Sequence, residues 1–413
     1  MQSESFAVSG RVAFRYPNFR YYMAARLLVV TSSEMQALAV AWQVYNLTHR
    51  PLDLGLVGLA QFLPGILLFL VAGHVADRVS RRRILQTCYA SFALCSTLLL
   101  ATSIHGLHSV WPVYLILLLN GAVRAFHGPA SQALLPLLVA EAHYPNALAW
   151  SVSVFQTATI VGPMIGGVLY GWLDSPVPIY MASGVAGLAG LALVSAVRLE
   201  RPQRRRAVES LGEVLDGLRY IRSHPVILGS ISLDLFAVLL GGAVALLPVY
   251  AREILRVGSL GLGMLRSAPG IGAVTMAVVL AHWPLRRRAG AAMLWSVVGF
   301  GVATIVFGFS RSLPLALAAL ALTGAGDMIS VMVRHTMIQL GTPDAMRGRV
   351  SAVNMVFIGA SNEVGQFESG LTAQWFGAVP AVILGGAASI AVVALCAWRF
   401  PELRRADAPT PAA

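Results

Sequence analysis

Apolar runs of about twenty residues, separated by short polar segments, repeat along almost the whole chain. A helix needs about twenty apolar residues to cross a bilayer, and the runs lack the alternation of a membrane β-strand. The pattern predicts an all-α integral membrane protein with twelve spanning helices, at residues 20–47, 53–77, 84–105, 111–138, 147–173, 177–198, 225–250, 259–282, 289–310, 313–340, 349–376 and 379–400.

The composition agrees with this pattern. Of 413 residues, 57% are hydrophobic and only 12% are charged, which leaves too little polar surface for a soluble globule. The first run lacks a small-residue cleavage site, so it is expected to remain as a membrane helix. Cys88, Cys95 and Cys396 lie inside apolar runs without metal-ligand spacing, so neither a metal nor a cofactor is expected.

The positive charge is unevenly distributed along the chain. The formal net charge of +12 involves no lysine, and an even number of spans places both termini on one side. That side would carry most loop arginines, including those at 11–20, 78–83, 198–222 and 399–405, whereas the other side would carry Arg50, Arg252, Arg256 and Arg311. The positive-inside rule therefore predicts an inner-membrane protein with both termini in the cytoplasm, and no nucleic-acid partner is needed.

The two halves of the chain are similar to each other. The segment GAVRAFHGP at Gly121 and the segment GAGDMISVM at Gly324 begin 203 residues apart, and AVAWQVY at Ala39 resembles AVALLPVY at Ala243. Their common order indicates a duplicated six-helix unit, a frequent construction among secondary transporters. We expect two pseudo-symmetric six-helix bundles, at 1–198 and 225–413, joined by a cytoplasmic linker at 199–224 with an amphipathic surface helix.

Two motifs and several longer segments resemble the major facilitator superfamily over nearly the whole length. The loop after the second run, with Gly73, Asp77, Arg78 and Arg81 to Arg83, is similar to the superfamily's signature loop, with Ser80 in place of the usual glycine. In the fifth run, Gly162, Pro163, Gly166 and Gly167 resemble an antiporter motif. The segments at 41–48, 54–64 and 361–386 are similar to the bacterial branch that contains the enterobactin exporter and related drug:proton antiporters.

The resemblance implies the major facilitator fold and a monomeric secondary active transporter. It would export a small organic molecule, such as a siderophore, a drug or a related metabolite, in exchange for protons by alternating access. No ATP-binding loop of the form GxxxxGK[ST] is present, so an ion gradient would supply the energy. An importer, a lipid flippase, and a receptor that transports nothing remain alternatives. A membrane enzyme is not expected, because its nucleophiles and bases would be scattered among the loops.

Within this family, Asp77 would accept hydrogen bonds from the N-terminus of the eleventh helix. Together with Gly73, Arg78 and Arg81 it would form a cytoplasmic gate. The arginines also fit simple retention of the loop in the cytoplasm. The glycines of the fifth run would allow close packing on the eighth helix, either as part of the antiporter motif or as ordinary small-residue packing.

Ionisable residues inside the apolar runs are the main site candidates, because each is costly in the membrane unless it is paired or hydrated. Glu34, Arg124 and Asp327 lie about 20 Å into their helices, near the midplane, and Asp234 lies closer to the cytoplasm. Glu34 is the first candidate for proton coupling, since burial favours its neutral form, and Asp327 and Asp234 are further candidates. Glu34 could instead be permanently paired with Arg124, and Arg124 could pair with Asp327 across the cavity.

Further candidates are weighed against structural roles. Arg334 and His335 could attract an anionic substrate or anchor a helix end. His127 could relay protons or simply pack. Glu363 and Glu368 in the eleventh run could couple protons or form hydrogen bonds within the second half. Trp42 and Phe126 are candidates for the cavity wall. The alternative is that they simply pack in the core or face the lipid. The expected partners are a small molecule, protons and the lipid bilayer.

Overall fold

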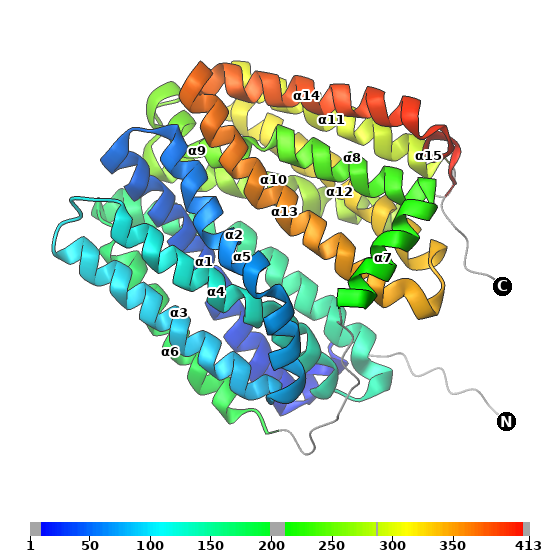
Figure 1. Cartoon of the computed structure of the whole chain (residues 1–413). Coiled ribbons are helices and arrows are strands. Elements are labelled where there is room, and N and C mark those ends of the chain that lie inside the picture. The colour runs from blue at the N-terminus through cyan, green and yellow to red at the C-terminus, as the bar shows by residue number, and fades with distance from the viewer. Residues whose placement is uncertain (1–9, 199–210, 286–287, 408–413) are drawn as a thin grey trace.

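The computed structural model describes residues 10–198, 211–285 and 288–407, and within them it contains helices and no strands (Figure 1). The long helices of the first half are α1 (Pro17–Thr48), α2 (Pro51–Arg78), α3 (Arg81–Ile104), α4 (Trp111–Leu134), α5 (Tyr144–Leu173) and α6 (Val177–Ala196). Those of the second half are α8 (Pro225–Gly241), α10 (Gly258–His282), α11 (Ala289–Phe309), α12 (Leu313–Gly341), α13 (Asp344–Phe376) and α14 (Ala378–Arg399). Shorter elements are η1 (Val12–Arg15), η2 (Leu135–Leu137), η3 (Glu141–His143), α7 (Leu211–Ser223), η4 (Ala243–Leu246), α9 (Leu247–Val249), η5 (Tyr250–Ile254) and α15 (Pro401–Arg405).

Local sequence signals set the helix starts. Pro17, Pro51 and Pro225 each occupy a first helical position, where the missing N–H costs no hydrogen bond. The polar break after the second run contains Ser80, whose Oγ accepts a hydrogen bond from the backbone N–H of Arg83 and caps α3. The arginine-rich loop of the sequence is therefore also a helix start.

Ten helical stretches among the described residues are long and apolar enough to cross a membrane. Helices α4 and α13 are not among these ten, although they have 24 and 33 residues. Polar residues such as Arg124 in α4 and Glu363 in α13 interrupt their apolar character. The all-α membrane fold is thus confirmed, whereas the count of twelve spans stays a prediction.

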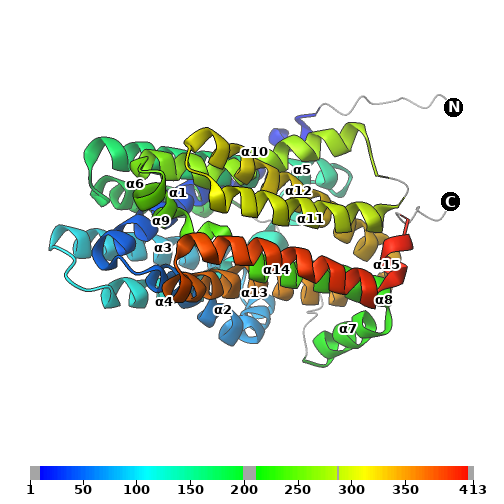
Figure 2. The same ribbon diagram turned by 90° about the horizontal axis from the view of Figure 1, so that it is seen from above.

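The helices pack mainly within their own half of the chain. In the first half α1 packs on α5 and α6, α3 on α4 and α6, and α2 on α4. In the second half α12 packs on α10 and α11, while α14 packs on α8 and α11. Figures 1 and 2 show α7 and α15 at one end of the molecule, which we call the tail end. The opposite end, where α1 ends and α2 begins, is the far end.

Two seams join the halves. Helix α5 packs on α10, and α2 packs on α13. A Cβ added to Gly167 of α5 would lie 2.7 Å from the backbone oxygen of Ser259 and 3.0 Å from Cα of Gly263, both on the α10 side. At the other seam, a Cβ on Gly370 of α13 would lie 2.9 Å from Cα of Gly55 in α2. Both seams therefore bring helix backbones into direct contact, which only glycine permits at this distance.

The predicted seventh span is not one continuous helix. Helix α8 ends at Gly241, and the chain then passes through η4, α9 and the π-helical η5 before α10 begins. The adjacent glycines Gly241 and Gly242 lower helix propensity at this point, and Pro248 cannot donate a backbone hydrogen bond. The break places backbone polar groups at membrane depth, where they are tolerated only inside protein or beside a cavity.

Within the predicted linker, residues 211–223 form α7, which packs on α13, and the role of this segment as a linker between two bundles stays a prediction. A Cβ on Gly217 would lie 2.8 Å from the backbone oxygen of Arg349, and Ile221 is buried in a cluster with Val350 and Val353. Leu215 and Leu218, in contrast, are exposed. Helix α7 therefore lies against the tail end of the second half, while residues 199–210 lie outside the described chain.

Candidate transport site

An ion pair joins the two halves near mid-depth. Nη2 of Arg266 in α10 lies 4.0 Å from Oε2 of Glu34 in α1, and the two side chains keep 26% and 30% of their surface exposed. Both groups are therefore partly hydrated, which reduces the cost of holding charge at this depth. The proton-coupling candidate Glu34 is thus paired across the interface, although its partner differs from the Arg124 considered from the sequence.

The antiporter-like motif of α5 lies directly against this pair. A Cβ on Gly162 would lie 2.6 Å from Cβ of Glu34, so only glycine leaves room for the carboxylate side chain here. Gly166 faces Met35, the residue after Glu34 in α1, whereas Gly167 faces α10. Pro163 contributes its backbone oxygen, which a Cβ on Gly263 would approach to 2.6 Å. The motif therefore holds α5 tightly between α1 and α10.

Two further charged side chains, Arg124 and Glu363, lie near the ion pair. Nη1 of Arg124 in α4 donates a hydrogen bond of 2.9 Å to Oε1 of Gln61 in α2. Glu363 in α13 accepts a hydrogen bond of 3.0 Å from Nε2 of Gln366. Arg124, Arg266 and Glu34 are all near enough to Glu363 to interact with it electrostatically. We call Glu34, Arg124, Arg266 and Glu363 the central quartet, which contains two acids and two bases.

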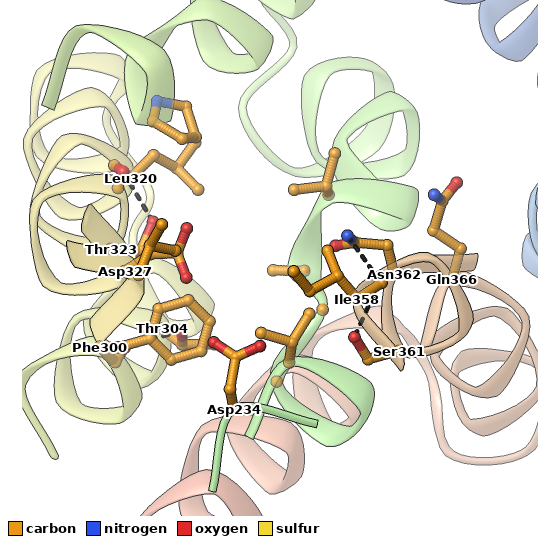
Figure 3. A pocket seen from close by; sticks show the side chains of 18 of the residues that line it. Asp234, Phe300, Thr304, Leu320, Thr323, Asp327, Ile358, Ser361, Asn362 and Gln366 are labelled. Atoms are coloured by element: carbon orange, nitrogen blue, oxygen red, sulfur yellow. Dashed lines mark hydrogen bonds between the residues drawn. The ribbon is translucent and has the colours of Figure 1, made fainter. Parts of the chain in front are cut away.

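The second half contains a cavity of about 390 Å³ between α8, α12 and α13. Figure 3 shows Asp327 and Thr323 of α12 facing Ile358 and Asn362 of α13, with Asp234 of α8 at the edge of the same space. Phe300 and Thr304 of α11 complete the wall, and the cavity also reaches Glu363 and Gln366. The cavity and the central quartet thus share Glu363.

The two most buried charged side chains among the described residues of the second half form an ion pair with each other. Arg334 of α12 forms an ion pair with Asp234 of α8, and these residues are only 3% and 5% exposed. Arg334 therefore ties two helices together inside the bundle. Asp327 has no hydrogen-bond or ion-pair partner among the described residues, so the cross-cavity pair with Arg124 considered from the sequence does not form in this structure.

Among the described residues, the remaining candidates make no hydrogen bond or ion pair with the quartet, although His127 lies one turn from Arg124 in α4. Trp42 is buried in the core, where it packs edge-on against Tyr170. His127 packs against the rings of Tyr89 and Phe92. The rest have separate positions: Phe126 lines an apolar pocket beside α3, His335 is exposed on α12, and Glu368 accepts a hydrogen bond from Thr372 one turn along α13.

The expected cytoplasmic gate is only partly described. Arg78 is exposed and Arg81 half-buried at the tail end, and neighbouring Arg82 donates a hydrogen bond to the backbone oxygen of Ser195. Gly73 and Asp77 belong to α2, but the side chain of Asp77 and the surroundings of Gly73 fall outside the described part of the structure. The gate therefore stays a prediction.

The far end is held together by polar contacts between the halves. The hydroxyl of Tyr45 in α1 donates to Oε1 of Glu253 in η5, and Arg252 donates to the side chain of Asn46. Ser259 and Ser267 of α10 also donate to backbone oxygens of α5. All these contacts, like the ion pair of Glu34, lie at mid-depth or toward the far end.

Arg266 is the site residue that the sequence reasoning missed. It lies seven residues into the apolar run 259–282, between Leu265 and Ser267. A basic residue at that depth is the same signal that identified Arg124. The main charged candidates were sought on the first helix of each three-helix repeat. Helix α10 is the eighth long helix from the N-terminus, the second of its repeat, so Arg266 was not considered.

Comparisons with known proteins agree with this architecture. A family model described as "Transmembrane secretion effector" matches residues 8–412. The enterobactin exporter EntS of Shigella boydii (serotype 4, strain Sb227) is 27% identical over 361 residues, which cover 86% of this chain and 84% of the relative. The enterobactin exporter of Escherichia coli (strain SMS-3-5) matches with the same identity and coverage.

Solved transporter structures share the fold. The nucleoside transporter NupG superposes with a TM-score of 0.71 at 13% identity, over 93% of this chain and 99% of that one. A bacterial homologue of the iron transporter ferroportin, in an inward-facing state, gives a TM-score of 0.71 at 15% identity, over 94% and 99% of the two chains. The relatives found are transporters rather than enzymes. Because the family model spans nearly the whole sequence, the chain belongs to the transmembrane secretion effector family of the major facilitator superfamily.

Proposed function

We propose that this protein is a secondary active transporter of the bacterial inner membrane that exports a small organic molecule in exchange for protons. The family description and the similarity to enterobactin exporters support export. The arginine distribution supports a cytoplasmic tail end, with both termini inside the cell. A siderophore, a drug or a related metabolite is the expected cargo, moved by a monomer.

The observation that carries proton coupling is the ion pair between Glu34 and Arg266. It links helices of different halves, so its strength depends on how the halves are oriented. Protonation of Glu34 removes its negative charge and with it the attraction to Arg266. A proton bound at Glu34 would therefore alter the relative stability of the two orientations, which is the requirement for coupling.

The contacts at the far end support alternating access. Tyr45 with Glu253, Asn46 with Arg252, and the glycines of both seams hold this end closed. Cargo would then enter from the cytoplasmic tail end, and these contacts would break when the site opens outward. In that outward-open state, Asp77 would act as the tail-end latch. The energy difference between the states must stay at a few kcal/mol, or one state would dominate.

Transport by inside-out proteoliposomes would test this proposal. The full-length protein would be reconstituted, the lumen made acidic, and the accumulation of radiolabelled enterobactin and, in parallel vesicles, of a radiolabelled cationic drug measured. An exporter coupled to protons should accumulate the label inside, against its gradient. Glu34→Gln should abolish this accumulation but retain exchange of labelled for unlabelled enterobactin, because exchange requires movement of the site without net proton transfer.

Glu141→Gln is the matched control, since Glu141 is an exposed glutamate in η3, before α5 begins, and makes no ion pair among the described residues. It should accumulate the label like the unchanged protein. Accumulation by Glu34→Gln at the unchanged level would exclude Glu34 as the coupling residue. Movement of the label out of the acidic lumen together with protons would show import and overturn the proposed direction.

A further inference from the structure

The cavity of the second half is built differently from the central quartet. Its wall comes from α8, η4, α10, α11, α12 and α13 of the second half, whereas the quartet draws residues from both halves. Its body is apolar, with Phe300, Leu320, Val331 and Ile358 in the wall. A cavity of about 390 Å³ with a mostly apolar wall and a few polar groups has the size and character of a small-molecule site.

Asp327 presents a carboxylate to this cavity without a counter-charge. Figure 3 shows it facing the open space from α12. No described arginine or hydrogen-bond donor contacts it, in contrast to Asp234, whose charge is matched by Arg334. A carboxylate in apolar surroundings loses hydration, and a bound cation would replace the missing interaction.

A second polar group near Asp327 also lacks a partner. Ser330, one turn farther along α12, is 2% exposed, and its Oγ makes no hydrogen bond among the described residues. It lines a separate small pocket beside the cavity, and Asp234 and Asp327 line both. Buried hydroxyls are nearly always hydrogen-bonded, so the Oγ of Ser330 is a polar group beside Asp327 that is available to a ligand or a water molecule.

The backbone adds to the negative potential. Helix α8 ends at the cavity, which is lined by Val238, Gly241 and Gly242. The last carbonyl groups of a helix carry a partial negative charge, equivalent to about half an elementary charge. With three acids and one arginine in its wall, the cavity favours a cation over an anion.

We propose that this cavity binds an organic monocation, such as a substituted ammonium, with its charged group against Asp327. The apolar part of the ligand would lie against Phe300, Leu320 and Ile358. This inference rests on the proposed export function, and among the cargo classes given there it selects a cationic drug or metabolite over a catechol siderophore, whose ionisable groups are acidic. A divalent metal fits the site less well, because such ions require several oxygen ligands and Asp327 is the only carboxylate there without a described partner.

The cavity also has a route to the central quartet through Glu363. This residue lines the cavity on α13 and interacts electrostatically with Glu34, Arg124 and Arg266. A cation bound beside Asp327 would attract Glu363 and weaken its hold on the two arginines. A ligand in the cavity would thus change the electrostatic environment of the Glu34–Arg266 pair. Ligand binding would in this way be coupled to the movement of the two halves.

Equilibrium binding to the purified full-length protein in detergent would test the proposal without any gradient. The probes are radiolabelled benzyltrimethylammonium and benzylsulfonate, which have similar shapes and opposite charges. The cation should bind saturably and more tightly than the anion. Asp327→Asn should weaken cation binding by about thirtyfold or more, as expected for the loss of one partner of a desolvated charge pair.

Two further variants complete the design. Asp327→Glu keeps the charge and should retain most of the binding. Asp174→Asn is the matched control, since Asp174 lies exposed after α5 in a left-handed conformation that asparagine also adopts. Absence of saturable cation binding, equal binding of the anion, or unchanged affinity in Asp327→Asn would each overturn the inference. None of these results would affect the transport test of Glu34, so the two proposals fail separately.

Discussion

Replacing Gly167 by alanine should open the far end of the molecule. The new methyl group would lie 2.7 Å from the backbone oxygen of Ser259 and 3.0 Å from Cα of Gly263. Both neighbours are backbone atoms, so neither can rotate away and the seam between α5 and α10 must widen by several tenths of an ångström. Overpacking of this kind costs about 1–3 kcal/mol. The cost applies only while the far end is closed, so the ratio of closed to open molecules should fall roughly 5- to 150-fold.

Distances between spin labels would measure this shift. Cysteines introduced at His108 and Ser312, which are exposed in far-end loops of different halves, would carry the labels after replacement of the three buried native cysteines. Gly167→Ala should move the distance distribution toward longer values. Gly171→Ala is the control one turn away, because its methyl would meet only side-chain Oγ of Ser259, at 3.3 Å, and atoms of Leu260 at 3.8 Å. Identical distributions for the two variants would refute the reasoning.

Two other variants test the contacts that hold the helices together. Asp234→Asn leaves the guanidinium of Arg334 buried without a counter-charge, so it should destabilise the protein by about 3–5 kcal/mol, seen as a lower thermal unfolding temperature in detergent. Replacing both residues by leucine and methionine should recover most of that loss, and an equally unstable double variant would contradict this account. Tyr45→Phe removes the hydrogen bond to Glu253, so the same spin labels should report an open far end roughly tenfold more often. An unchanged distance distribution would show that this hydrogen bond does not keep the far end closed.

The sequence was sufficient for the fold because membrane insertion leaves a clear pattern. Hydrocarbon cannot hydrogen-bond to the backbone, so each apolar run has to be a helix, and eleven of the twelve expected runs form one long helix each. The exception is the seventh, where the glycine pair at 241 and 242 interrupts the helix. Hydropathy does not report such a break, because glycine changes backbone freedom without adding polarity.

The site was harder to predict because charge depth identifies residues but not their partners. Glu34 and Arg124 were found from their depth, and both lie in the central quartet. Their contacts, with Arg266 and Gln61, depend on how helices from different parts of the chain pack. That Gly162 makes room for Glu34 was likewise not readable, since it requires knowing that α5 lies against α1. Which side chains meet is decided by how the helices pack. The depth of a residue in its own helix, in contrast, can be read from the local sequence.

The backbone contacts at the far end also bear on how well the membrane holds its ion gradient. The side chains of Glu34 and Arg266 are each more than a quarter exposed, so water reaches mid-depth in this state. Where Gly167 meets Gly263, and Gly370 meets Gly55, the helices are too close for a chain of water molecules to pass. A proton at Glu34 therefore has no aqueous path onward through these seams. Because these contacts are made by backbone rather than by mobile side chains, the two seams should not conduct protons while the far end is closed.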